Sequence, residues 1–343
     1  MDVLNATLNS DSFPMHNATD VPKPEVIMHL ELRIAFAIRY YLPSILIVAG
    51  TVGNILSFLV FSSPAMKHSQ TSFLFRLLAI YDTIALQIGL WGFILLDILH
   101  SDAYHATNAA CKSLTYVQTV SRDLSVWLLC FISIERCVGV YVPHKVKIFI
   151  TKKRVRIAVV IMIFASLLAN ASLIISTETR AMYDTAGNIA RRYCAIPGNP
   201  WNERFAGVYW PWIDLFKYCF LPFAIMISCN IALVYKVIKA FAHRRQSTNQ
   251  ESDSSSQVSS MTMVLITVSI TYIILTLPIC IFFLTANSHV YIVGTHYYAQ
   301  LKLWHTLGHL SSHANHCVNF FLYCISGKQF RAELLKLFSC KNK

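Results

Sequence analysis

Long apolar runs recur along the whole chain and limit its fold more than any other feature. A helix of about 20 residues crosses the roughly 30 Å hydrocarbon core of a bilayer. Seven stretches reach or approach that length, at residues 34–61, 73–99, 114–134, 157–175, 205–238, 261–284 and 301–325. Only 13% of the 343 residues are charged, against about 25% in a soluble domain. The sequence therefore predicts an all-α membrane protein, a seven-transmembrane helix bundle, and excludes a soluble enzyme.

The run at 301–325 is the most polar of the seven. Unsatisfied polar groups are costly in hydrocarbon, so this segment has to face protein or water. Its histidines have helical spacing and stand at His305, His309, His313 and His316. Seven spans are predicted, and six is the alternative if this segment does not cross.

Basic residues mark one side of the predicted bundle. Six lie between residues 145 and 156, four between 236 and 245, and five between 328 and 343. Lys and Arg concentrate in cytoplasmic loops, so these segments are expected inside. The net charge of +12 is interpreted as attraction to the anionic inner leaflet, with no nucleic-acid partner. The predicted domains are an extracellular segment at 1–33, a transmembrane domain at 34–326 and a cytoplasmic tail at 327–343.

Glycosylation signals agree with this orientation. Asn5 and Asn17 each begin an Asn-Ala-Thr triplet, the acceptor pattern for N-linked glycans. The N-terminal segment lacks the apolar core of a cleaved signal peptide. The sequence predicts a multi-pass plasma-membrane protein with its N-terminus outside.

Ten cysteines divide by position. Cys111 begins the third run on the oxidising side, and Cys194 lies in the loop between the fourth and fifth runs. A disulfide between them would hold that loop over the bundle. Cysteines inside spans are commonly small apolar residues, and this interpretation covers Cys130, Cys219, Cys229, Cys280, Cys317 and Cys324.

The tail predicts a short amphipathic surface helix. Phe330, Leu334, Leu337 and Phe338 have helical spacing, and basic residues between them can face lipid head groups. Cys340 follows, either acylated or as a free thiol.

Several motifs together resemble the rhodopsin-like (class A) family of G-protein-coupled receptors over nearly the whole chain. They are Gly53-Asn54, Asp82, Glu135-Arg136-Cys137, Pro143, Pro222, Pro278, the pair Cys111 and Cys194, and Asn319 to Tyr323. The resemblance implies a G-protein contact region at Glu135, Arg136, Cys137 and Pro143. It implies activation switches at Pro222, Tyr272, Thr276, Pro278, Asn319 and Tyr323. In this picture Glu135 holds Arg136 in the resting bundle.

The chain departs from the family pattern in the sixth and seventh runs. Thr276 stands where the family usually has Trp, and Tyr272 replaces the usual Phe. Asn319 is followed by Phe320 in place of Pro, so a weaker kink is expected there.

The resemblance also implies an allosteric sodium ion at Asp82. Hard cations prefer oxygen ligands, and the matching positions carry Ser121, Ser125, Asn315 and Asn319. The alternative is a protonated Asp82 in a hydrogen-bond network. No other cofactor and no catalytic residue are expected.

The ligand class is narrowed by what the sequence lacks. His313 stands where a visual pigment needs Lys, and Gln118 stands where an amine receptor needs Asp. A peptide is the best remaining class, and the resemblance is greatest to invertebrate receptors for FMRFamide-like and myosuppressin-like neuropeptides. An amidated Arg-Phe end requires a carboxylate and aromatic rings. The candidate ligand-binding residues are Asp97, Gln118, Arg122, Trp210, Trp212, Asp214, Phe283, His305 and His309.

Alternatives remain at this point. Arg122 could pair internally with Asp214 or Asp123 instead of contacting a ligand. The implied partners are an extracellular peptide, a heterotrimeric G protein and membrane lipid. A secondary transporter with a buried cation site is an alternative function, although the sequence has no internal repeat. A membrane enzyme with a metal on the histidine row is a further alternative.

Overall fold

The computed structural model describes residues 29–99, 101, 103–142, 150–183, 189–246, 253–286 and 295–339. Four residues singled out in the sequence, Asn5, Asn17, Pro143 and Cys340, lie outside these ranges.

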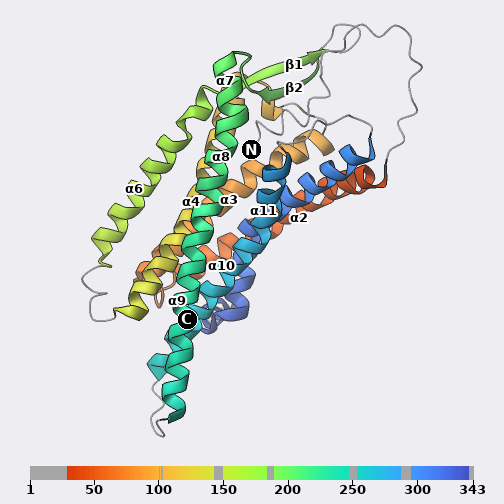
Figure 1. Cartoon of the computed structure of the whole chain (residues 1–343). Coiled ribbons are helices and arrows are strands. Elements are labelled where there is room, and N and C mark those ends of the chain that lie inside the picture. The colour runs from red at the N-terminus through yellow and green to blue at the C-terminus, as the bar shows by residue number, and fades with distance from the viewer. Residues whose placement is uncertain are drawn as a thin grey trace.

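Each of the seven apolar runs falls in helical structure, which confirms the predicted bundle (Figure 1). Six helical segments are long and apolar enough to cross a membrane within the described ranges. The seventh is α11, which has 31 residues and a polar face. The long helices are α2 (Leu30–Phe61), α3 (Gln70–Phe93), α4 (Asn108–Tyr141), α6 (Lys152–Asn170), α9 (Leu221–Gln246), α10 (Asp253–Ala286) and α11 (His296–Ser326).

Short helical turns extend several of these helices. The π-turn η1 (Ile94–Ile98) follows α3, the 3₁₀ turn η2 (Ala103–His105) precedes α4, and the 3₁₀ turn η3 (Ala171–Ile174) follows α6. The fifth span is a series of α7 (Pro200–Arg204), η4 (Phe205–Tyr209), α8 (Trp210–Leu215), η5 (Phe216–Phe220) and α9, in which η4 and η5 are π-turns. Pro222 is the second residue of α9 and cannot donate a backbone hydrogen bond, which suits the π-turn just before it.

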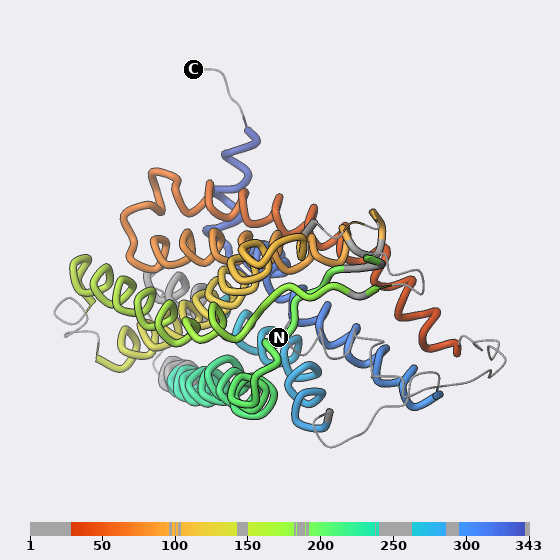
Figure 2. The backbone as a smooth tube through the Cα atoms, turned by 90° about the horizontal axis from the view of Figure 1, so that it is seen from above, coloured from red at the N-terminus to blue at the C-terminus, as the bar shows by residue number. Residues whose placement is uncertain are grey.

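The polar helix α11 lies inside the bundle, where it packs against α2, α10 and α3 (Figure 2). Its polar side chains are therefore buried against protein. Gly53 allows one of these contacts, because a Cβ there would lie 2.9 Å from the Cβ of Phe320. Contact with three neighbouring helices explains why a segment with many polar side chains can be part of a membrane bundle.

A β-hairpin between the fourth and fifth spans was not anticipated from the sequence. β1 (Glu178–Tyr183) pairs antiparallel with β2 (Ile189–Ala195). The hairpin covers one end of the bundle, called here the hairpin end (Figure 1).

The predicted tail helix is confirmed as α12 (Lys328–Phe338). Phe330 is buried against Phe61 and Tyr323, whereas Phe338 on the other face is exposed. This helix lies at the opposite end of the bundle, called here the α12 end (Figure 1).

Candidate functional site

A disulfide anchors the hairpin to the bundle. Cys111, in the first turn of α4, is bonded to Cys194 in β2, and their Cα atoms are 5.7 Å apart. The backbone N–H of Thr179 in β1 donates to Asn108 Oδ1, also in α4. The loop between the fourth and fifth spans is thus held above the site described next.

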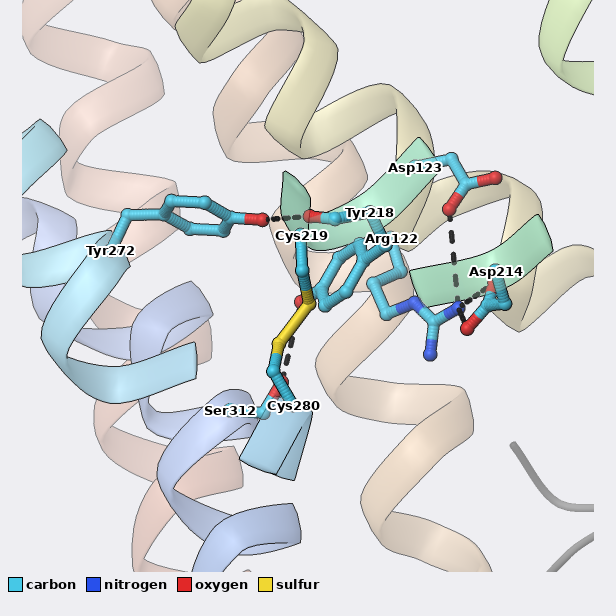
Figure 3. The surroundings of a disulfide bond; sticks show 8 residues. All are labelled: Arg122, Asp123, Asp214, Tyr218, Cys219, Tyr272, Cys280 and Ser312. Atoms are coloured by element: carbon cyan, nitrogen blue, oxygen red, sulfur yellow. Dashed lines mark hydrogen bonds and ion pairs between the residues drawn. A yellow bond between two sulfur atoms is a disulfide. The ribbon is translucent and has the colours of Figure 1, made fainter. Parts of the chain in front are cut away.

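Four charged side chains form a buried ion cluster between α4 and the fifth span. Figure 3 shows three of them, Arg122, Asp123 and Asp214. Arg122 donates to both oxygens of Asp214, at 2.8 and 2.9 Å. Lys217 Nζ lies 2.7 Å from Asp214 Oδ1 and 2.5 Å from Asp123 Oδ2. Asp214 therefore forms ion pairs with two cations, and Lys217 forms ion pairs with both acids. Of the two alternatives for Arg122, the structure contains the internal pair with Asp214.

Aromatic rings border the ion cluster. The Arg122 guanidinium lies 4.3 Å from the centre of the Tyr218 ring, and Lys217 Nζ lies 5.3 Å from the centre of the Trp210 ring. Cations over aromatic faces gain electrostatic attraction in a desolvated site. The two acids are thus surrounded by cations and π-systems, and a charge-balanced cluster can stay buried.

Most of the predicted ligand-binding residues lie near the cluster or on α11. Gln118, Arg122 and His309 line one small cavity together with Ser312 and His313. Phe282 packs against both Phe283 and His305. Trp212 differs, because 52% of it is exposed on another face of the fifth span than buried Trp210. Asp97 belongs to η1, and its side chain lies outside the described part of the structure.

A row of four histidines runs along α11. The ring centres of His305 and His309 are 5.7 Å apart, those of His309 and His313 are 4.6 Å apart, and those of His313 and His316 are 6.4 Å apart. Both ring nitrogens of His309 are buried without a hydrogen-bond partner among the described residues. The row leads from the cavity beside Arg122 to Asp82.

Gly89 of α3 makes room for this row. A Cβ at Gly89 would lie 2.2 Å from Nε2 of His313 and 2.7 Å from Nε2 of Gln118. The close approach of α3 to α11 here requires a residue without a side chain.

Asp82 is fully buried and forms hydrogen bonds with three side chains. Ser125 Oγ donates to Oδ1 at 2.5 Å, and Asn319 Nδ2 donates to Oδ2 at 2.8 Å. The third partner is Nδ1 of His316, 2.7 Å from Oδ1. The predicted neighbours Ser121 and Asn315 are buried nearby on the same helices.

Several oxygen atoms around Asp82 are of the type that a hard cation prefers as ligands. Oδ1 of Asn315 and Oδ1 of Asn319 are buried without a partner among the described residues. Of these two residues, Asn319 contacts Asp82 directly through its Nδ2. The Asp82 carboxylate, the Ser125 hydroxyl and the amide oxygen of Asn319 are ligands of the kind that such a cation prefers. The competing feature is His316, which already occupies one carboxylate oxygen.

In the sequence, the histidine row is a possible metal site. The described ranges contain no group of three or more His, Cys, Asp or Glu side chains arranged to hold a metal ion. The enzyme alternative based on a histidine-bound metal therefore gains no support.

At the α12 end, Thr71 joins the acid and the base of the Glu-Arg-Cys triplet. Its hydroxyl lies 3.0 and 3.1 Å from the carboxylate oxygens of Glu135. Arg136 donates to the same hydroxyl oxygen. No direct ion pair between Glu135 and Arg136 occurs in this described region, so the expected direct contact is replaced by a bridge through α3. Cys137 donates to the carbonyl oxygen of Cys229 in α9.

The residues expected to act as switches belong to the fifth, sixth and seventh spans, and all except the half-buried Pro278 are buried. Tyr272 donates to the backbone carbonyl of Tyr218 (Figure 3). Thr276 is fully buried, and its hydroxyl has no partner among the residues described. Pro278 lies inside α10, and Tyr323 packs against Phe75.

A second disulfide lies in this region and corrects the interpretation of two cysteines. Cys219 of η5 is bonded to Cys280 of α10 (Figure 3). The interpretation of these two cysteines as small apolar residues is therefore wrong. The bond joins the fifth and sixth spans close to Pro222 and Pro278.

Some of the contacts that were not predicted have a signal in the sequence, and others have none. Lys217 follows Asp214 by three residues, so their shared helical face could be read from the spacing. His316 precedes Asn319 by three residues, which places both on the face toward Asp82. The pair Cys219 and Cys280 depends on the rotation of two helices, which the spacing does not contain.

Comparison with known proteins agrees with this arrangement. A sequence model of the 7 transmembrane receptor (rhodopsin family) matches residues 53–323. The FMRFamide peptide receptor frpr-18 of Caenorhabditis elegans is 24% identical over 211 residues, which are 60% of this chain and 48% of the relative. The FMRFamide receptor of Drosophila melanogaster is 24% identical over 313 residues, 89% of this chain and 54% of the relative.

A vertebrate protein is also similar. The mesotocin receptor of Rhinella marina is 25% identical over 240 residues, which are 69% of this chain and 54% of the relative. The chain spans about half the length of these relatives. Since the family model covers well over half of the chain, the chain belongs to the rhodopsin family of seven-transmembrane receptors.

Proposed function

We propose that this receptor binds an amidated neuropeptide ending in Arg-Phe at the hairpin end and activates a heterotrimeric G protein at the α12 end. Two of its relatives are FMRFamide receptors, and a rhodopsin-family receptor is a signalling protein without catalysis. The observation that carries the proposal is the buried ion cluster, because it offers a carboxylate that a peptide arginine can reach by exchange.

The contacts of the cluster support the exchange. Arg122 and Lys217 balance Asp123 and Asp214, so a ligand arginine adds one positive charge. Lys217 already contacts both acids and can stay on Asp123 while the ligand guanidinium takes its place on Asp214. A bidentate guanidinium–carboxylate pair is stronger than a single ammonium contact. Ligand binding therefore rearranges contacts between α4 and the fifth span.

The ligand's phenylalanine and amide have matching surroundings. Phe283 and Trp210 are buried on the spans that border the cluster, and aromatic pairs add to the gain from burial. His309 has two unpartnered ring nitrogens among the described residues, which can bond a terminal amide. Gln118 and His305 complete this polar side, and Asp97 and Trp212 are further proposed ligand contacts.

The G protein contacts Glu135, Arg136, Cys137 and Pro143 once the bundle opens. In the resting arrangement the Thr71 hydroxyl holds Arg136 beside Glu135. Separation of the helices at the α12 end frees Arg136 for a partner's carbonyl oxygens. The rearrangement passes through Pro222, Tyr272, Thr276, Pro278, Asn319 and Tyr323.

The receptor lies in the plasma membrane with the hairpin end outside. Basic residues gather at the α12 end, where α12 rests on the inner leaflet. Asn5 and Asn17 then carry glycans on the outer side.

A sodium ion stabilises the resting state at Asp82. Ser121, Ser125, Asn315 and Asn319 supply the other oxygen atoms, two of which are buried and unpartnered among the described residues. A ligand that binds one state better shifts the population to that state. His316 competes with the ion for the carboxylate.

The test uses cells that express the receptor, with surface expression verified by antibody. A panel of amidated Arg-Phe peptides and their free-acid forms is applied while calcium and cyclic AMP are recorded. The amidated peptides are expected to produce a response that the free acids do not. Silence towards all of them at verified surface expression contradicts the proposal.

A further inference from the structure

A second cavity lies far from the ion cluster, at the α12 end between α4 and α6. It is a groove of about 400 Å³. Its described wall is almost entirely apolar, with Phe131, Ile134 and Val138 from α4 and Val155 and Ala158 from α6. Among the described lining residues, Glu135 alone also belongs to a site described above. An apolar wall of this kind suits an apolar occupant.

The rim of the groove is strongly basic. α6 begins at the rim with Lys152, Lys153, Arg154 and Arg156, all exposed, and its first turn has no acidic residue. The N-terminus of a helix adds a partial positive charge. An apolar groove with such a mouth matches a molecule that has a hydrocarbon chain and an anionic head.

The position of α6 leaves the groove open to the bilayer. Helix α6 lies at the edge of the bundle and packs against α4 (Figure 2). Its apolar side chains Ile157, Ile161, Phe164 and Leu168 are exposed, as expected for a surface in contact with lipid. An acyl chain can therefore enter from the membrane without crossing water.

We infer that the groove binds one acyl chain of an anionic phospholipid of the inner leaflet, with its head group held by Lys152, Lys153 and Arg154. Polybasic segments next to a membrane attract anionic lipids, and the groove adds a fixed place for the chain. Glu135 lines the same groove and accepts the hydrogen bond from Thr71. An occupied groove thus touches the Thr71 bridge from the side of α4.

The test uses purified full-length receptor in phosphatidylcholine nanodiscs. They contain a trace of phosphatidylserine with a photoactivatable diazirine in its acyl chain. After illumination, labelled peptides are identified by mass spectrometry. Label is expected on residues 131–142 and 150–158, and at least about tenfold less with a phosphatidylcholine probe of the same chain. Equal labelling by both probes overturns the inference.

Two variants separate the chain from the head group. Ala158→Phe fills the groove and is expected to abolish the label, whereas Ala165→Phe, on an exposed part of the same helix, is expected to keep it. The triple variant K152Q/K153Q/R154Q changes three exposed side chains and therefore leaves the core intact. It is expected to remove the preference for phosphatidylserine, and K67Q at another exposed site is the control.

Competition by a soluble head group tests whether the acyl chain is needed for binding. Excess glycerophosphoserine, which lacks the acyl chains, is expected not to compete. Competition by it, or unchanged labelling of Ala158→Phe, shows a head-group site only and overturns the inference. The assignment to the inner leaflet rests on the orientation in the proposed function. The readout needs no peptide agonist, so its failure can be distinguished from failure of the proposed peptide ligand.

Discussion

The imidazole Nδ1 of His316 lies 2.7 Å from the carboxylate of Asp82, beside the hydroxyl of Ser125. A side chain that carries its own hydrogen-bond donor thus stands where a bound cation would approach. The carbonyl of His316 accepts from Nδ2 of Asn54 at 3.1 Å, which fixes this turn of α11 against α2. If the proposed sodium ion binds Asp82, His316 and the ion compete for the same oxygen.

Replacing His316 by Ser is expected to increase sodium sensitivity. The change removes the competing donor and adds an oxygen. A hydrogen bond to a charged group contributes about 1.5–3 kcal/mol, so the sodium concentration needed for half-maximal effect should fall roughly tenfold or more. The measurement is agonist binding over a sodium titration with choline as the replacement cation. Asp82→Asn is the control and should show no sodium effect, and an unchanged titration curve for H316S contradicts the competition.

Loss of the Thr71 hydroxyl is expected to raise ligand-independent signalling. Thr71→Val keeps the shape of the side chain and removes the only hydroxyl shared by Glu135 and Arg136 in the described structure. Loss of about 1–2 kcal/mol from the resting state corresponds to roughly 5- to 30-fold more of the active state. Basal nucleotide exchange by the G protein measures this. Thr71→Ser retains the hydroxyl and should behave as wild type, and equal behaviour of both variants would refute the bridge.

The disulfide between Cys219 and Cys280 is expected to restrain the fifth and sixth spans. Cys219→Ala and Cys280→Ala each break the same bond, so either change should raise basal nucleotide exchange as much as both together. Cys130→Ala, which removes a buried free thiol in α4, controls for loss of packing. Additive effects of the two single variants would show that the cysteines act separately.

Gly89 gives a prediction on stability. Gly89→Ala places a methyl group 2.2 Å from Nε2 of His313, and overpacking costs about 1–3 kcal/mol. The thermal midpoint of purified receptor, followed by tryptophan fluorescence, should fall. Gly139→Ala adds a methyl group with no described atom within 4 Å and should hold or raise the midpoint, because Ala favours helix by about 1 kcal/mol. A midpoint that falls equally for both changes would exclude the close contact as the cause.

The helices could be predicted from the sequence because each span needs a long apolar run, and α2 and α10 follow such runs closely. The hairpin could not be predicted from the sequence. Its strands carry Thr179, Arg180, Arg191 and Arg192, and their pairing depends on a link to α4 through Cys194. A two-stranded hairpin without a hydrophobic face of its own has little local signal.

The candidate site was partly visible in the sequence. Charged residues inside spans are costly, which drew attention to Asp82 and Arg122. The contacts of Lys217 and His316 depend on how neighbouring helices are rotated, which the sequence does not contain. Thr71 gave no signal at all, since a threonine near a helix start is common and its hydroxyl matters only through Glu135 and Arg136.

The most direct measurement is a double-mutant cycle between Asp214 and the ligand's arginine. Wild type and Asp214→Asn are each titrated with an amidated Arg-Phe peptide and with its citrulline analogue, which is isosteric and uncharged, while nucleotide exchange is recorded. Glu203→Gln, an exposed acid in α7, is the matched control. If the ligand arginine binds Asp214, each single change lowers potency and the second adds little, with a coupling of about 0.5–3 kcal/mol. Potency losses that add fully, or an Asp214→Asn receptor that still distinguishes arginine from citrulline as wild type does, would contradict the account.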